Sequence, residues 1–121
     1  MDTVLIVDDN PDLLEVVAEV LQTLGNITVH RAGSALEALR VYESVDPALV
    51  ILDEGLADMP GSELLRRLRR ANARARRPAL FITGSLSSVR CMPGDVVLEK
   101  PVEMSRLLDA VRSLVSEATA G

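Results

Sequence analysis

The chain alternates between short, continuously apolar runs and longer stretches in which apolar residues recur at helical spacing. The apolar runs occupy residues 3–7, 48–52, 78–83 and 95–99, and a more alternating run occupies residues 27–32. A strand that is apolar on both faces must be buried on both faces, as in a parallel sheet that lies between two layers of helices. The sequence therefore predicts an α/β fold in which strands and helices alternate along the chain.

Four stretches have the apolar spacing of amphipathic helices. Asn10 is suited to cap the first of them, and Pro11 suits its first helical position. Ser34 and Glu37 have the spacing of a capping box at the start of the second. The expected helices occupy residues 11–24, 34–44, 61–73 and 103–117.

The number and order of these elements fit one domain over residues 1–121 with a flavodoxin-like, doubly wound, five-stranded parallel sheet. The strand order expected for this fold is 2-1-3-4-5, with helices on both faces and residues 27–32 as an edge strand. The segment 84–94 has little helical periodicity and closes with Pro93 and Gly94. We therefore expect the fourth helix, between the last two strands, to be short or absent.

Composition argues against several kinds of partner. The formal net charge of −5 does not favour nucleic acid, and the basic segment 66–77 is expected to be the solvated face of the third helix and the loop after it. No apolar stretch approaches the roughly 20 residues of a membrane span, and no signal-peptide pattern is present. Cys91 is the only cysteine and has no internal disulfide partner. We therefore expect a cytoplasmic protein with no membrane contact.

Polar side chains stand at the ends of four of the apolar runs. They are Asp8 and Asp9 after the first run, Asp53 after the run 48–52, Thr83 at the end of the run 78–83 and Lys100 after the last run. Ligands of open parallel sheets bind beyond the carboxyl ends of the strands, so we expect these side chains to meet in one site. Adjacent carboxylates near apolar material repel one another and lose hydration unless a cation or a proton compensates them.

This set of groups predicts a site for Mg2+ and a phosphoryl group. Mg2+ prefers oxygen ligands, binds through one or two carboxylates while keeping several waters, and is commonly shared with phosphates. Thr83 can donate a hydrogen bond to a phosphoryl oxygen, and Lys100 can pair with its charge. Asp53 is then available as a nucleophile, because carboxylates accept phosphoryl groups as aspartyl phosphates.

Four segments of the chain together resemble the receiver domain of two-component response regulators: VLIVDDNPDLLEVVAEVLQTLG, VILDEGLADMPGSELLRRLR, FITG and LEKPVE. The resemblance covers nearly the whole chain and implies that Asp53 is the phosphoacceptor. It also implies that Asp9 contacts Mg2+ directly and that Asp8 does so through water. Gly55 stands where the family supplies a backbone carbonyl ligand.

The same resemblance assigns the switch hydroxyl to Thr83, the lysine of the site to Lys100 and a cis peptide bond to Pro101. The implied phosphodonor is a histidine kinase or a phosphotransfer protein, and the phosphorylated form would bind an unknown downstream protein differently. The implied protein is a signalling switch rather than an enzyme, and a monomer or weak dimer. It would act alone, as a phosphorelay intermediate, or as a domain of a longer regulator or hybrid histidine kinase.

Three features depart from the common receiver pattern. Val97 stands in the last strand where the family often has tyrosine or phenylalanine. The segment 83–100 is several residues shorter than usual, and Ala57 and Pro60 change the placement of proline in the loop after the phosphoacceptor. The stretch PALFITG, residues 78–84, is similar to the Pro-x-x-Phe-Ala-Thr-Gly motif of a subset of receivers that also lacks the aromatic residue. We therefore expect an atypical receiver of that kind.

Three other functions fit the sequence less well. A dehalogenase-type phosphatase also uses an aspartate nucleophile and Mg2+, but usually has a second aspartate where this chain has Gly55. A flavin carrier needs a neutral, donor-rich phosphate loop after the first strand, and Asp8 and Asp9 would repel phosphate there. A receiver-like protein that binds partners without phosphorylation would not need the complete acidic set.

Overall fold

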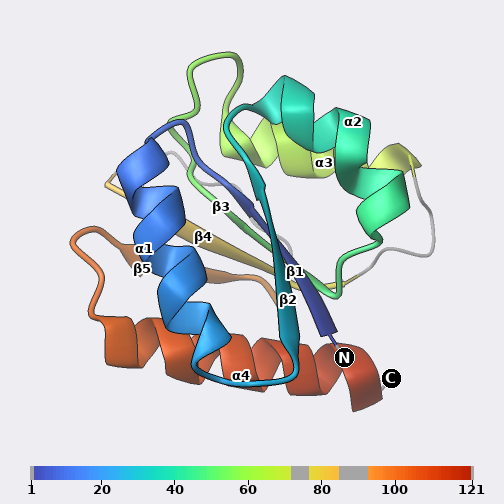
Figure 1. The fold of residues 1–121 in the computed structure, drawn as a ribbon. Coiled ribbons are helices and arrows are strands. Elements are labelled where there is room, and N and C mark those ends of the chain that lie inside the picture. Colours follow the sequence, from blue (N-terminus) through green and yellow to red (C-terminus); the bar gives the residue numbers. More distant parts are fainter. Residues whose placement is uncertain (1, 72–76, 85–92, 121) are drawn as a thin grey trace.

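The computed structural model describes residues 2–71, 77–84 and 93–120 (Figure 1). In chain order, its elements are β1 (Asp2–Val7), α1 (Pro11–Gln22), β2 (Ile27–Ala32), α2 (Ala35–Val45), β3 (Leu49–Leu52), α3 (Gly61–Ala71), β4 (Ala79–Thr83), β5 (Val96–Glu99) and α4 (Met104–Ala120). These elements correspond to the five strands and four helices expected from the apolar pattern. The segment 84–94 between β4 and β5, where a short or absent helix was expected, lies mostly outside the described residues, because residues 85–92, including Cys91, are not described. Residues 72–76 of the basic segment are not described either.

The five strands form one parallel sheet in the order β2-β1-β3-β4-β5, as predicted. Strand β2 lies at an edge and pairs only with β1, which agrees with its alternating composition. The chain leaves β1 toward β2 on one side and later returns to β3 on the other side. The reversal of strand order therefore falls between β1 and β3, the place where open α/β sheets bind their ligands.

The apolar runs of the strands are buried because each face of the sheet has its own helical layer (Figure 1). Alternate strand residues pack with α2 and α3 on one face and with α1 and α4 on the other. Leu5, Val7, Leu52 and Phe81 are typical of the first core, and Val4, Ile6, Ile51 and Leu80 are typical of the second. In the described part of the chain, no helix is long and apolar enough to span a membrane.

The helix starts follow the capping residues that the sequence indicates. The Asn10 side chain accepts hydrogen bonds from the backbone N–H groups of Asp12 and Leu13 ahead of α1, and Ser34 accepts one from Glu37 ahead of α2. Helix α1 ends at Gln22 rather than at Leu24. The backbone N–H groups after it donate to carbonyls three residues back, which tightens the last turn and ends the helix.

An ion pair holds the amino ends of β4 and β5 together, at the end of the sheet opposite Asp53. Arg69 of α3 donates from Nη1 and Nη2 to the two carboxylate oxygens of Asp95, at 3.0 and 2.7 Å. Asp95 Oδ1 also accepts a hydrogen bond from the backbone N–H of Ala79, at 3.0 Å. The Asp95 side chain is only 1% exposed. The pair therefore fixes the start of β5 against both α3 and β4.

We predict that Asp95→Ala lowers the free energy of unfolding by about 3 kcal/mol, because it leaves the half-buried Arg69 guanidinium and the Ala79 N–H without this acceptor. Urea denaturation followed by circular dichroism measures the loss. The matched control is Glu63→Ala, which removes an exposed intrahelical pair with Arg66 and should change stability little. Equal losses in the two variants would contradict the prediction.

Candidate functional site

The carboxyl ends of β1, β3, β4 and β5 bring four of the predicted residues to one edge of the sheet. The backbone N–H of Asp53 donates to the Val7 carbonyl at 3.3 Å, which places Asp53 next to Asp8 at the end of the neighbouring strand. The backbone N–H of Lys100 donates to the Thr83 carbonyl at 2.9 Å, which sets Lys100 next to Thr83. Asp8, Asp53 and Thr83 are buried, although all three are polar. The peptide bond between Lys100 and Pro101 is cis.

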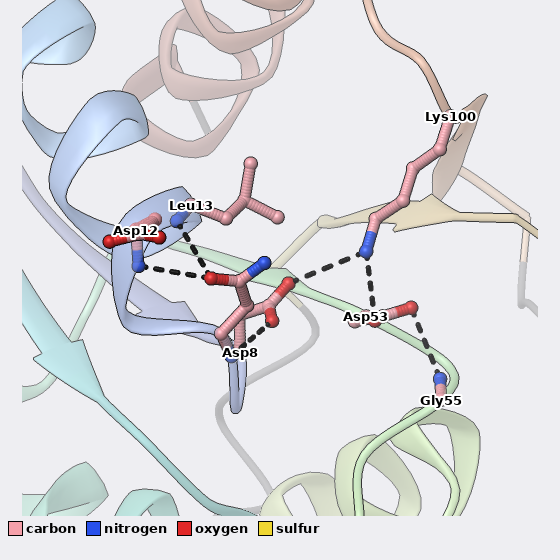
Figure 2. Close-up of polar contacts among 7 residues, drawn as sticks. Asp8, Asp12, Leu13, Asp53, Gly55 and Lys100 are labelled. Carbon is pink, nitrogen blue, oxygen red and sulfur yellow. Dashed lines mark hydrogen bonds and ion pairs between the residues drawn. The ribbon is translucent and has the colours of Figure 1, made fainter.

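Lys100 joins the two buried carboxylates (Figure 2). Its Nζ lies 3.0 Å from Oδ2 of Asp53 and 3.7 Å from Oδ2 of Asp8. Partial burial disfavours the charged ammonium, but the hydrogen bond to Asp53 and the charges of both carboxylates outweigh it. The pKa of Lys100 is therefore raised above its ordinary value. The chain's only lysine therefore lies at this site in its charged form at neutral pH.

Asp8 is a buried carboxylate beside two other acidic residues. The pKa of the Asp8 carboxyl is raised, mainly because burial disfavours its charged form. The charges of Asp53 and Asp9 act in the same direction. A hydrogen bond from the Asn10 backbone N–H to Asp8 Oδ1, at 2.8 Å, and the charge of Lys100 oppose the shift. A further cation at this edge would relieve the remaining repulsion.

The Asp53 carboxylate is held from two sides (Figure 2). Its Oδ2 accepts from Lys100, and its Oδ1 accepts from the Gly55 backbone N–H at 3.1 Å. Thr83, Gly84, Lys100 and the β3–α3 loop, which we define as residues 53–60, line a hollow of about 680 Å3 above it. Asp53 therefore presents its carboxylate to an accessible space while its own orientation is fixed.

Two residues that the sequence analysis did not single out fix the backbone around Asp53. Glu54 is buried, and its carboxylate turns away to α3, where Oε1 accepts from the Ser62 N–H at 2.6 Å and Oε2 accepts from the Ser62 hydroxyl at 2.8 Å. Gly61 lies so close that a Cβ atom built on it would collide with the Asp53 carbonyl oxygen. The helix start therefore packs directly on the backbone of Asp53. In the sequence, the only feature that indicates the contact between Glu54 and α3 is the position of this carboxylate shortly before the helix start.

The donor set of the site fits Mg2+ rather than a metal that needs a full cage of side chains. The atoms available as ligands at this edge are oxygens, from the buried Asp8 and Asp53, the exposed Asp9 and the backbone of Gly55. Over residues 2–71, 77–84 and 93–120, no group of three or more His, Cys, Asp or Glu side chains is arranged to hold a metal ion. Mg2+ needs only one or two carboxylates, because it keeps several waters.

Comparison with known proteins agrees with this geometry. Residues 4–112 match the family described as the response regulator receiver domain. The chain belongs to this family. Receiver domains generally bind Mg2+ at their acidic pocket, and those of response regulators accept phosphoryl groups from histidine kinases.

Individual relatives support the family and the fold. The chain is 31% identical over 121 residues to the transcriptional regulatory protein TrcR of Mycobacterium tuberculosis, across 96% of this chain and 46% of TrcR. It is 24% identical over 121 residues to the polar-differentiation response regulator DivK of Brucella ovis, across 96% of this chain and 98% of DivK. A CheY-like receiver domain structure from Methanospirillum hungatei matches with a TM-score of 0.83 and 25% identity, covering 99% and 98% of the two chains. The chain spans about half the length of the first curated relatives that it matches.

We predict that Gly61→Ala destabilises this receiver domain by about 2 kcal/mol, because the new methyl group forces either α3 or Asp53 to shift. Urea denaturation measures the change. Gly33→Ala is the control, since a Cβ atom there would meet no heavy atom within 4 Å. The prediction fails if both alanine variants keep the wild-type stability.

Proposed function

We propose that this receiver domain is a phosphorylation-dependent switch that accepts a phosphoryl group on Asp53 in a Mg2+-dependent reaction. The observation that carries the proposal is the Asp53 carboxylate, which opens to the hollow and is held between Lys100 Nζ and the Gly55 N–H. A phosphorylated histidine of a histidine kinase or of a phosphotransfer protein is the proposed donor. An Asp53 oxygen would form the new bond to phosphorus while the bond between phosphorus and the imidazole nitrogen breaks, leaving the donor histidine free.

The residues of the chain would contribute mainly orientation and charge to this transfer. Asp8, Asp9, Asp53 and the Gly55 carbonyl would hold the Mg2+ ion, which when bound neutralises charge on the phosphoryl oxygens. Lys100 already lies on Asp53, so its ammonium is within reach of a phosphoryl group attached there. The Thr83 hydroxyl, at the end of β4 on the wall of the same hollow, would donate to a phosphoryl oxygen.

The response to phosphorylation would not use an aromatic ring in β5. Val97 packs against the core shared with α2 and α3, and it offers no side chain that rotates between buried and exposed positions. A change at Thr83 would instead be passed to a downstream protein by neighbouring backbone and helices. The chain would act alone, as a relay intermediate, or as a domain of a longer protein in the cytoplasm.

Phosphorylation is tested by incubating the protein with acetyl phosphate, with and without Mg2+, and measuring the intact mass. We expect one phosphoryl group on the wild type, only with Mg2+, and none on Asp53→Asn. Beryllofluoride, which mimics a bound phosphoryl group, serves as a second probe if the adduct decays quickly. Absence of both the adduct and beryllofluoride binding would refute the proposal, and so would equal labelling of Asp53→Asn.

Mg2+ alone is also expected to stabilise the fold, because it offsets the repulsion between buried carboxylates. At ten times its dissociation constant, a ligand of the folded state alone contributes about 1.4 kcal/mol, which corresponds to a rise of about 5 °C in melting temperature. Differential scanning calorimetry at increasing MgCl2, with NaCl at matched ionic strength as control, measures the rise. If millimolar Mg2+ raises the melting temperature no more than NaCl does, the proposed metal site is wrong.

A further inference from the structure

Asp58 makes a contact that the proposed chemistry does not use. It lies in the β3–α3 loop, yet its carboxylate caps a different helix, α2. Oδ1 accepts a hydrogen bond from the Ala35 N–H at 3.1 Å, and Oδ2 accepts one from the Leu36 N–H at 2.9 Å. The Oγ atom of Ser34, the N-cap of α2, accepts a hydrogen bond from the next N–H, that of Glu37, at 3.1 Å. The first-turn N–H groups of α2 are therefore shared between a local cap and a carboxylate from a distant loop.

The contact favours a charged carboxylate. The N–H groups of Leu36 and Ala35 hold the pKa of the Asp58 carboxyl below its ordinary value. The positive end of the α2 dipole acts on the same carboxylate. Two hydrogen bonds to two oxygens also fix its direction, so the loop residue that carries it has little freedom. Asp58 therefore ties the loop to α2 in a defined position.

The contact between Asp58 and α2 is one of three attachments that hold the residues around Gly55. Glu54 is bonded to Ser62 at the start of α3, and Leu56 is buried in the core beneath α2 and α3. Asp58 attaches the far part of the loop to α2. Gly55 itself is exposed and has no side chain, and its N–H donates to Asp53 Oδ1 at 3.1 Å. The position of its carbonyl oxygen therefore depends on this bond and on the attachments of its neighbours.

We propose that Asp58 is a positioning residue for Mg2+, which fixes the β3–α3 loop on α2 and so holds the Gly55 carbonyl where the ion needs a ligand. This inference rests on the proposed function, because it assumes the Mg2+ site at Asp8, Asp53 and Gly55. Holding a ligand in place before binding improves affinity, since less freedom is lost when the ion binds. Mutating a residue that orients a metal ligand without contacting the metal typically lowers metal affinity tenfold or more.

The simpler interpretation is that Asp58 serves only the stability of α2. The chain offers a matched control for it, because Ser34→Ala also removes a cap from the same helix end, but the hydrogen bond it removes goes to Glu37 of α2 and not to the loop. Under the simpler interpretation, Asp58→Ala and Ser34→Ala both lower stability and leave Mg2+ affinity unchanged. Under our proposal, only Asp58→Ala weakens Mg2+ binding.

The experiment is isothermal titration of MgCl2 into the wild type, Asp58→Ala, Asp58→Asn and Ser34→Ala, at a temperature where all are folded. We expect a dissociation constant about tenfold higher for Asp58→Ala and unchanged for Ser34→Ala. Asp58→Asn keeps one oxygen acceptor and should fall between them, and it serves as the test if the alanine variant does not fold.

Labelling by acetyl phosphate gives a second measurement on the same variants. Asp58→Ala should need about tenfold more Mg2+ for half-maximal labelling rate, yet approach the wild-type rate at saturating Mg2+. Equal Mg2+ affinity in the wild type and both Asp58 variants would overturn the inference while leaving the proposed function intact. If the wild type itself bound no Mg2+, the proposed function would fail, and the inference with it.

Discussion

The bridge from Lys100 to Asp53 and Asp8 is the interaction on which the site depends. Burying two carboxylates side by side costs free energy in proportion to their lost hydration and mutual repulsion. A single ammonium at 3.0 and 3.7 Å offsets part of that cost, while burial, together with the charges of Asp53 and Asp9, raises the pKa of Asp8. The buried apolar residues of the strands, such as Val7, Leu52 and Ile82, stabilise the sheet that carries these carboxylates. A cation bound beside these carboxylates would lower this cost further, which is the physical basis of the proposed Mg2+ site.

The charged residues at the two ends of the sheet are arranged differently. At the amino ends of β4 and β5, Asp95 is fully paired with Arg69 and Ala79, and its side chain is closed to solvent. That arrangement satisfies each charge within the protein and leaves nothing for a ligand. At the carboxyl ends, Asp53 faces an open hollow and shares its lysine with Asp8. The stabilising ion pair and the proposed ligand site therefore lie at opposite ends of the strands.

The apolar pattern was sufficient to predict the sheet, its parallel order and its helices, because burial on both faces leaves a strong signal in sequence. It also identified Asp8, Asp53, Thr83 and Lys100 as neighbours, since the ends of parallel strands meet at one edge. It could not indicate which carboxylates Lys100 contacts, because side-chain reach across strands has no periodicity. Nor could it indicate that Asp58 bonds to α2, a contact between residues more than twenty positions apart that depends on how the loop folds.

Gly61 and Gly55 show why the loop after Asp53 needs its particular sequence. Its residues alternate between buried Glu54 and Leu56 and exposed Gly55 and Ala57, which turns the Gly55 backbone toward solvent at the hollow. The start of α3 then packs on the Asp53 carbonyl at a distance that only glycine at position 61 permits. Three interactions restrain the loop: Leu56 is buried in the core, Glu54 accepts hydrogen bonds from α3, and Asp58 accepts hydrogen bonds from α2. Under the proposed function, losing one of these attachments would hold the Gly55 backbone less precisely and so weaken Mg2+ binding.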